Sequence, residues 1–263
     1  MLLLARALDC EREWIVAHGE ARAASAPARR FETLCNLRAS GMPMAYVLGF
    51  AGFYGREFLV DERVLVPRPE TEHLIDEALT FLKARRSAGM PAGTNVLDVG
   101  TGSGAIACTV AAENGDAFVH ATDVSARALE VARINAGRLN VAERCRFHCG
   151  RFAGPVAGRR FDLVLANLPY VPTPDIPPRP NPIAFEPREA LDGGPDGLDA
   201  YREFVPEVPG LLEPDGAAVF EAGPALMPEL VALVERTFRA RPVEVGYDYA
   251  GHARFVMVAT ASR

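Results

Sequence analysis

The sequence has few cysteines, a single tryptophan and no long uninterrupted apolar stretch. Its five cysteines are odd in number and scattered over 263 residues, which does not match the even, regularly spaced set of a disulfide framework. No apolar run approaches the roughly 20 residues of a membrane-spanning helix. The apolar start, residues 1–8, is too short for a secretory signal and has no basic segment before it. We therefore expect a cytoplasmic protein with reduced thiols and no membrane association.

The chain also lacks the excess of basic residues that accompanies binding to nucleic-acid phosphates. Its formal net charge is −6, from 28 Lys and Arg against 34 Asp and Glu. Metal-ligand spacing is missing as well. Cys145 and Cys149 belong to a segment whose alternating pattern predicts a strand, and no second ligand pair lies at zinc spacing. We predict neither a large nucleic-acid footprint nor a metal site.

What is present is an ordinary globular composition, with 49% hydrophobic and 24% charged residues. Residues 1–45 carry apolar side chains at helical spacing and predict a small helical N-terminal domain, broken near its middle by Pro27. This segment is too small to fold alone, so we expect it to pack on the rest of the chain or to form a homodimer. Aromatic and β-branched residues punctuated by glycine predict a β-hairpin linker over residues 46–66, followed by one larger domain over residues 67–263.

In the larger domain, expected strands and helices alternate. Strands are predicted at residues 96–99, 118–122, 144–149, 161–166, 216–221, 243–249 and 253–260. Helices are predicted at residues 70–86, 105–112, 126–139, 197–208 and 226–239. This order indicates an α/β fold with a mostly parallel sheet, helices on both faces, and a final antiparallel pair joined by a short turn. Ligands of such folds bind at the carboxyl ends of the strands.

A glycine-rich loop lies between the first strand of this domain and the helix that follows. Asp98 precedes the loop, and Asp123 ends the next strand, where a carboxylate can bind both hydroxyls of a ribose. Nicotinamide enzymes use a similar loop, but here the spacing is G-x-G-x-G, and Asp98 would repel a pyrophosphate while attracting a cationic amino acid group. The pattern favours S-adenosylmethionine, whose sulfonium and ammonium are positive. The loop residues assigned to this donor are Gly100, Thr101, Gly102, Ser103 and Gly104.

The sequence Asn167-Leu168-Pro169-Tyr170 directly follows the expected strand 161–166. It resembles the (D/N)-P-P-Y signature of methyltransferases that modify planar amide or amino nitrogens. The lone pair of such a nitrogen is delocalised, so the site must hold it in line with the methyl group. The Asn167 side-chain oxygen and the Leu168 carbonyl can accept its two N–H bonds. Tyr170 is expected to pack against the flat acceptor group.

Several further segments resemble the HemK/PrmC-like protein-glutamine methyltransferases. They are residues 41–49, 64–72, 98–107, 185–194 and 247–254. The resemblance implies a seven-stranded, Rossmann-like class I methyltransferase sheet with a small helical N-terminal domain and a β-hairpin linker. It also implies methyl transfer from S-adenosylmethionine to the glutamine side chain in the Gly-Gly-Gln motif of peptide release factors. By motif, Phe152 lies beside the adenine and Asn167 near the donor, while the catalytic set is Asn167, Leu168, Pro169 and Tyr170.

Three features depart from that family pattern. Leu168 replaces a proline, Arg151 stands where an acidic residue is usual, and the N-terminal helical region is about half the usual length. Arg151 cannot accept a hydrogen bond from the adenine amino group, because a guanidinium only donates. Two alternatives therefore stay open beside methylation of a release factor or another glutamine-bearing protein. One is an enzyme acting on a small molecule or on S-adenosylmethionine itself, and the other is a non-catalytic donor-binding protein.

Overall fold

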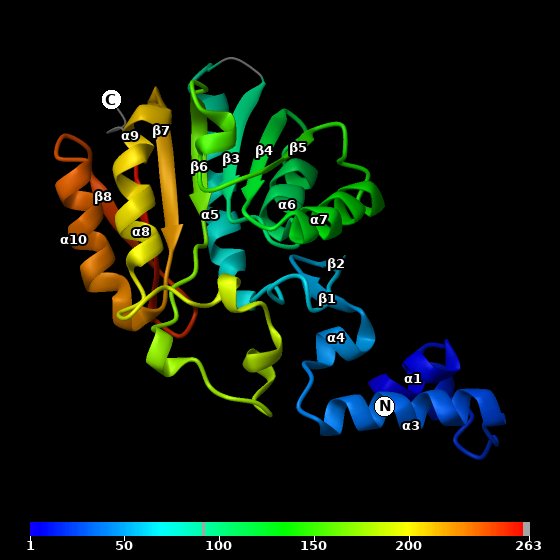
Figure 1. Cartoon of the computed structure of the whole chain (residues 1–263). Coiled ribbons are helices and arrows are strands. Elements are labelled where there is room, and N and C mark those ends of the chain that lie inside the picture. The colour runs from blue at the N-terminus through cyan, green and yellow to red at the C-terminus, as the bar shows by residue number, and fades with distance from the viewer. Residues whose placement is uncertain (91–92, 260–263) are drawn as a thin grey trace.

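Seven strands form one sheet in the order β5-β4-β3-β6-β7-β9-β8 (Figure 1). The computed structural model describes residues 1–90 and 93–259. The strands are β3 (Thr94–Val99), β4 (Ala117–Asp123), β5 (Cys145–Cys149), β6 (Phe161–Ala166), β7 (Leu212–Glu221), β8 (Val243–Tyr247) and β9 (Ala253–Val258). Neighbours among β3 to β7 pair in parallel, whereas β9 is antiparallel to both β7 and β8. The predicted final antiparallel pair is confirmed; Thr260, its expected last residue, lies outside the described residues.

The register of the central strands brings three loops to one edge. Val99 at the end of β3 pairs with Thr122 of β4 on one side and with Ala166 of β6 on the other. The glycine-rich loop, Asp123 and Asn167 therefore leave the sheet next to one another. Because the chain continues on opposite sides of β3, this edge is a topological switch point, where α/β sheets bind their ligands.

Helices cover both faces of the sheet (Figure 1). They are α5 (Glu72–Ser87), α6 (Ala105–Glu113), α7 (Ala126–Arg138), α8 (Asp199–Phe204), α9 (Val208–Leu211) and α10 (Met227–Thr237). The predicted helix 197–208 is shorter than expected. It ends at Phe204 and continues as the 3-10 turn Val205–Glu207, where Pro206 lacks the N–H that α-helical hydrogen bonding needs.

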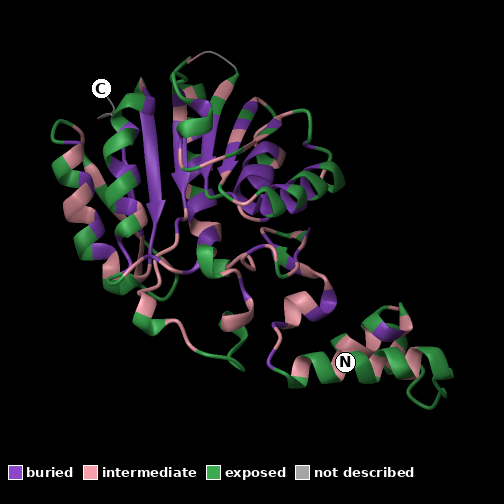
Figure 2. Cartoon of the chain, in the orientation of Figure 1, coloured by how far each residue is buried: buried purple, intermediate pink, exposed green. Residues whose placement is uncertain are grey.

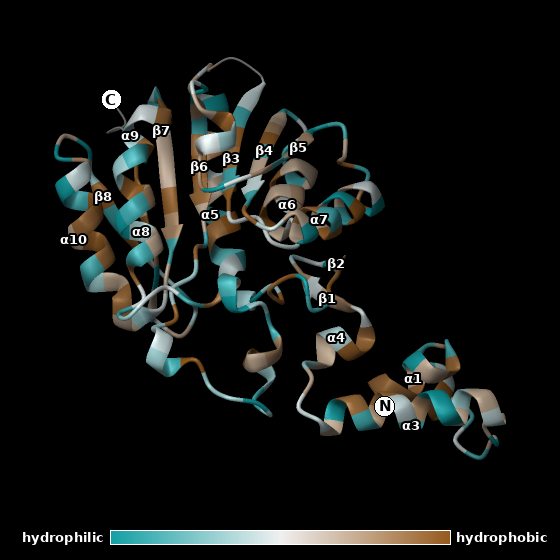
Figure 3. Cartoon of the chain, in the orientation of Figure 1, coloured by the Kyte–Doolittle hydropathy of each residue, from teal (hydrophilic) through white to brown (hydrophobic). Residues whose placement is uncertain are grey.

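The hydrophobic core has a layer on each face of the sheet. One layer packs Leu74 and Ile75 of α5 and Val110 of α6 against the strands. The other packs the helices α8 to α10, including Tyr201 and Phe204, against the opposite face. Figure 2 shows that buried residues concentrate in the strands, and Figure 3 shows the same strands as predominantly hydrophobic. Burial on both faces explains why these strands have continuous apolar runs.

The N-terminal part is helical, as predicted, and mostly exposed (Figure 2). It comprises α1 (Leu2–Leu8), α2 (Arg12–Ala17), α3 (Ser25–Ala39) and α4 (Met44–Leu48). The expectation that Pro27 breaks the helical run is wrong, because α3 begins at Ser25 and runs through it. Pro27 lies in the first turn, where backbone N–H groups have no helical partner to lose. Trp14 and Val16 of α2 keep 44% and 69% of their surface exposed.

The hairpin occupies only the centre of the segment 46–66. Its strands are β1 (Phe50–Phe53) and β2 (Arg56–Leu59), while residues 46–48 belong to α4. The buried Asn135 of α7 joins the hairpin to the larger domain. Its side chain accepts from the Leu59 N–H at 2.8 Å and donates to the carbonyls of Leu59 and Ser103. The domain boundaries themselves stay a prediction.

Two sequence features have plain structural outcomes. All five cysteines have free thiols. Within residues 1–90 and 93–259, every helix is too short or too polar to cross a bilayer.

Candidate active site

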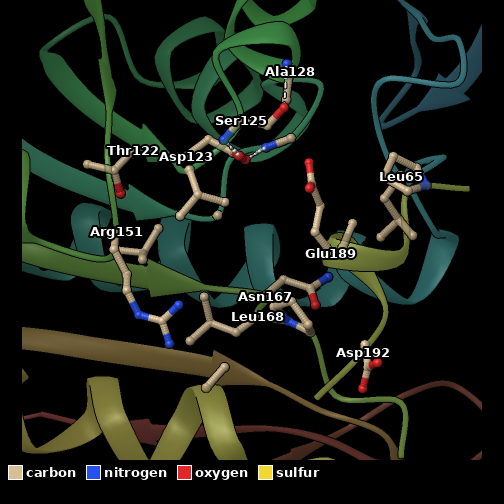
Figure 4. A pocket seen from close by; sticks show the side chains of 18 of the residues that line it. Leu65, Thr122, Asp123, Ser125, Ala128, Arg151, Asn167, Leu168, Glu189 and Asp192 are labelled. Atoms are coloured by element: carbon tan, nitrogen blue, oxygen red, sulfur yellow. Dashed lines mark hydrogen bonds between the residues drawn. The ribbon is translucent and has the colours of Figure 1, made fainter. Parts of the chain in front are cut away.

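A cavity of about 470 Å³ opens at the carboxyl edge of the sheet (Figure 4). This volume lies within the roughly 300–1,000 Å³ that is common for small-molecule sites. Seven of the residues predicted from the sequence line it: Gly100, Gly102, Asp123, Phe152, Asn167, Leu168 and Pro169. Five others are not on its wall: Asp98, Thr101, Ser103, Gly104 and Tyr170.

Asp98 lies near the end of β3, just before the glycine-rich loop, and has no exposed surface. Its Oδ2 accepts hydrogen bonds from the Thr101 hydroxyl at 2.5 Å and from the Ala107 N–H at 3.1 Å. It thereby ties the loop to the first turn of α6. Burial raises the pKa of Asp98 to about 7, although both hydrogen bonds oppose the rise. Thr101 and Ser103 are also buried, so the chain presents mainly backbone to the cavity at this loop.

The two glycines on the cavity wall have positive φ angles, 77° at Gly100 and 53° at Gly102, which L side chains rarely adopt. At Gly100 the absence of a side chain also serves packing. A Cβ there would lie 3.3 Å from the Leu168 side chain. Gly100 and Leu168 therefore pack against each other just beyond the ends of β3 and β6.

Asp123 ends β4 with its carboxylate at the cavity. One oxygen accepts from the Gly102 N–H and the other from the Ser125 N–H, both at 2.8 Å (Figure 4). These two bonds orient the carboxylate, and each oxygen keeps a further lone pair for a ligand. Burial raises the pKa of Asp123. Its geometry suits a pair of adjacent hydroxyl donors.

The cavity wall carries acidic side chains, whereas its arginines are already paired. Glu189 is among the side chains around the cavity (Figure 4). Arg63 pairs with Asp61 at 2.6 Å, and Arg151 binds Glu203 through two guanidinium nitrogens. An acidic wall with neutralised arginines suits a cationic ligand.

Phe152 holds a backbone conformation that is uncommon for a residue with a side chain, with φ 45°. Its ring lies against Phe204, with the ring centres 5.4 Å apart. The Arg151 guanidinium lies over the Phe152 ring at 4.6 Å. Arg151, one of the departures from the family pattern, is therefore held between Glu203 and Phe152. There its guanidinium supports the Phe152 ring, which lines the cavity.

The turn after β6 is held by buried partners. Leu168 is 3% exposed, and its backbone N–H donates to the Tyr201 hydroxyl at 3.1 Å. The same hydroxyl donates to the backbone carbonyl of Glu221. The Asn167 Nδ2 donates to the Thr71 hydroxyl at 3.1 Å. Tyr170 instead lies near Gly223, at 3.5 Å from where a Cβ of that glycine would be.

One buried carboxylate links two segments that each contribute a residue to the cavity wall. Glu186 accepts from the Val66 N–H at 3.0 Å and from Arg68 at 2.6 Å. The neighbouring residues Leu65 and Pro187 line the cavity.

Sequence reasoning missed Thr71, Tyr201 and Glu221, which surround the Asn167–Leu168 turn. Glu221 had a usable signal, since it is a carboxylate at the carboxyl end of a predicted buried strand. Tyr201 had none, because its hydroxyl is brought to the turn by helix packing. Across the described part of the chain, no group of three or more His, Cys, Asp or Glu side chains has a metal-binding arrangement.

Two family models match the chain. A methyltransferase domain matches residues 91–242, and the PrmC N-terminal domain matches residues 1–49. Among solved structures, a methyltransferase from Pyrococcus furiosus has a TM-score of 0.54 at 19% identity, covering 88% of this chain and 97% of its own. The ribosomal protein L11 methylase of Lactobacillus delbrueckii has a TM-score of 0.52 at 19% identity, covering 77% and 84%. These structures share the class I methyltransferase fold.

Curated relatives extend the likeness over almost the whole chain. The release factor glutamine methyltransferase of Moorella thermoacetica is 39% identical over 253 residues, 96% of this chain and 87% of that protein. The protein of the same name from Rhodopirellula baltica is 34% identical over 99% of this chain and 88% of its own. Together with the loop, Asp123 and Asn167 at one cavity, these matches identify the chain as an S-adenosylmethionine-dependent methyltransferase that belongs to the release factor glutamine methyltransferase family.

Proposed function

We propose that the enzyme methylates the side-chain amide nitrogen of the glutamine in the Gly-Gly-Gln motif of a peptide release factor. The observation that carries this proposal is the Asn167 amide at the cavity, whose Nδ2 donates to Thr71. Its Oδ1 is then the atom available to accept a hydrogen bond from an acceptor amide. The names of the relatives support the same substrate.

The cavity residues fit S-adenosylmethionine. We assign the ribose hydroxyls to the Asp123 carboxylate, the close backbone approach to Gly100 and Gly102, and the adenine to the Phe152 ring. The acidic wall suits the positive charges of the donor. When bound, the donor supplies an electrophilic methyl group on its sulfonium.

The acceptor side of the site works by orientation. In our proposal the Asn167 Oδ1 and the Leu168 carbonyl accept the two N–H bonds of the glutamine amide. They hold its nitrogen in place and stabilise the positive charge that it gains on methylation. A strong general base is not needed at that point, because the nitrogen can lose its proton to water afterwards. Pro169 lines the cavity and limits the space beside the acceptor.

The decisive experiment is mass spectrometry of a purified release factor incubated with the enzyme and S-adenosylmethionine. We expect one added methyl group on the Gly-Gly-Gln glutamine and S-adenosylhomocysteine in equal amount. A release factor with this glutamine replaced by glutamate is the control and stays unmodified. Consumption of the donor without modification of the factor would contradict the proposal and favour a small-molecule acceptor or chemistry on the donor itself.

This substrate also implies a cytoplasmic location, since release factors act at ribosomes. The expectation of a homodimer is independent of the substrate. It rests on the exposed side chains of α2, and the sedimentation behaviour of the purified chain tests it.

A further inference from the structure

A buried carboxyl group lies behind the proposed acceptor site and has no role in the function proposed so far. Glu221 ends β7 and is 3% exposed. Its Oε1 accepts a hydrogen bond from the Thr71 hydroxyl at 3.1 Å. Within the described residues its Oε2 has no hydrogen-bond partner. A carboxyl oxygen that is buried without a partner is costly, so its presence calls for a functional reason.

Thr71 connects Glu221 to Asn167. A hydroxyl has one hydrogen, and here Thr71 donates it to Glu221. Toward Asn167 the Thr71 oxygen can therefore only accept, and the group facing it is the Asn167 NH2. The direction of this short chain of hydrogen bonds decides which end of the Asn167 amide faces Thr71 and which is left for the acceptor.

We propose that Glu221 is a positioning residue for methyl transfer, which acts through Thr71 to turn the Asn167 side-chain oxygen toward the acceptor nitrogen. This inference rests on the proposed function, because it assumes that Asn167 accepts a hydrogen bond from the acceptor amide. An ionised Glu221 can only accept, which fixes the direction of the chain. A protonated Glu221 can donate to Thr71, which frees the Thr71 hydrogen to bind the Asn167 oxygen and turns the amide around.

The surroundings of Glu221 tune this choice. The Thr71 hydroxyl, Arg254 of β9 and the nearby Asn167 amide favour the ionised form, and Glu70, in the turn before α5, disfavours it. Tyr170 and Tyr201 also lie nearby, the latter with its hydroxyl on the Glu221 backbone carbonyl. Burial is the largest effect and raises the pKa of Glu221 to about 7. Both forms of the carboxyl are therefore populated near neutral pH.

The first test observes Asn167 directly and needs no acceptor. The side-chain NH2 resonances of 15N-labelled full-length protein are assigned by their loss in Asn167→Ala, then followed from pH 5.5 to pH 8.5. We expect the Asn167 signals to shift with a midpoint near the Glu221 pKa in the wild type and to stay constant in Glu221→Gln. Asn167 signals that ignore pH in the wild type, or that titrate equally in Glu221→Gln, would overturn the inference whether or not the enzyme methylates a release factor.

The second test measures kcat at saturating donor and release factor. A group of pKa about 7 is about a tenth ionised at pH 6 and about nine tenths at pH 8, so the wild type should gain about tenfold in kcat over this range. In Glu221→Gln the gain should vanish. Glu77→Gln is the matched control: Glu77 is a half-buried carboxyl of α5 whose pKa burial also raises, and it should keep the wild-type profile.

Variants of Thr71 separate this role from a merely structural one. Thr71→Val keeps the shape but removes the hydroxyl, so kcat at pH 8 should fall about tenfold with an unchanged KM for the donor. Thr71→Ser restores the hydroxyl and should restore both kcat and its pH dependence. A wild type that methylates the release factor while Thr71→Val keeps full kcat would disprove the positioning role and leave the proposed function intact.

Discussion

The backbone N–H of Leu168 donates a hydrogen bond to the buried hydroxyl of Tyr201, 3.1 Å away. Proline, which the resembled motif has at this position, has no N–H to offer. Leucine therefore lacks the rigidity of the proline ring but gains a backbone hydrogen bond. The Tyr201 hydroxyl in turn donates to the Glu221 carbonyl, which connects the turn to β7.

Tyr201→Phe removes this connection while keeping the aromatic packing. We expect the free energy of unfolding to fall by about 1–3 kcal/mol, because two buried backbone groups lose their partner. Methyl transfer should weaken in kcat more than in donor affinity, since the turn that carries Asn167 loosens. Urea unfolding and steady-state kinetics measure the two effects. Tyr247→Phe, at a tyrosine that is 60% exposed, is the control and should change neither.

Asn167→Ala tests the residue assigned to the acceptor amide. Loss of one preorganised hydrogen-bond partner of the reacting group typically lowers kcat by about 10²–10³-fold, and we expect a loss in this range. Calorimetry should give a donor Kd within about twofold of the wild type. Asn36→Ala, on the exposed side of α3, should behave as the wild type. Normal methylation by Asn167→Ala would remove Asn167 from the mechanism.

Asp123→Ala tests the donor site. The variant loses the carboxylate assigned to the ribose and also frees the Gly102 and Ser125 N–H groups. We expect the donor Kd to rise by about tenfold or more, the size of a lost charge-assisted pair of hydrogen bonds. Asp215→Ala changes an exposed aspartate on β7 and should leave the Kd unchanged. An Asp123→Ala chain that folds and binds the donor normally would refute the assignment.

The pH dependence of stability should report the buried carboxyl of Glu221. Its pKa is raised above the ordinary value of 4.5 to about 7, so the folded chain holds a proton there that the unfolded chain releases. The stabilisation is complete below about pH 4.5 and is lost as the pH rises through 7. Relative to the wild type, Glu221→Gln should therefore gain stability from pH 5 to pH 8, by up to about 3 kcal/mol.

The comparison is made against the wild type because other groups titrate in the same range. Burial lowers the pKa values of His120 and His148, which makes the fold more stable as the pH rises. Asp98, with its raised pKa, acts in the same direction as Glu221. Urea unfolding at both pH values gives the difference, and a Glu221→Gln chain that gains no stability between pH 5 and pH 8 would contradict the prediction.

Much of the fold was predictable because its signals are local. The buried strands and the glycine-rich loop follow one another at short range, so their order already indicates a parallel sheet and its functional edge. The errors arise where context decides. Pro27 interrupts a helix in its interior but not in its first turn, and the difference is set by where the chain turns before Ser25.

The sequence motifs that line the site were predictable, whereas the residues that hold those motifs in place were not. Gly100, Asp123 and Asn167 lie at strand ends, and the topology alone brings them together. The contacts of Thr71 with Asn167 and Glu221 span 96 and 150 residues along the chain. No local pattern encodes such contacts, because they depend on how α5 packs against the sheet.

The double contact of Glu186 has a mechanical consequence. The Glu186 carboxylate binds Val66 and Arg68, about 120 residues earlier in the chain, so the two wall segments that include Leu65 and Pro187 are fixed to each other. Moving these segments apart would leave the buried Glu186 carboxylate without its hydrogen-bond partners, which is strongly destabilising. A cavity wall that resists widening favours a narrow substrate segment. The glutamine of a Gly-Gly-Gln motif is preceded by two residues without side chains, so this segment is as narrow as a peptide can be.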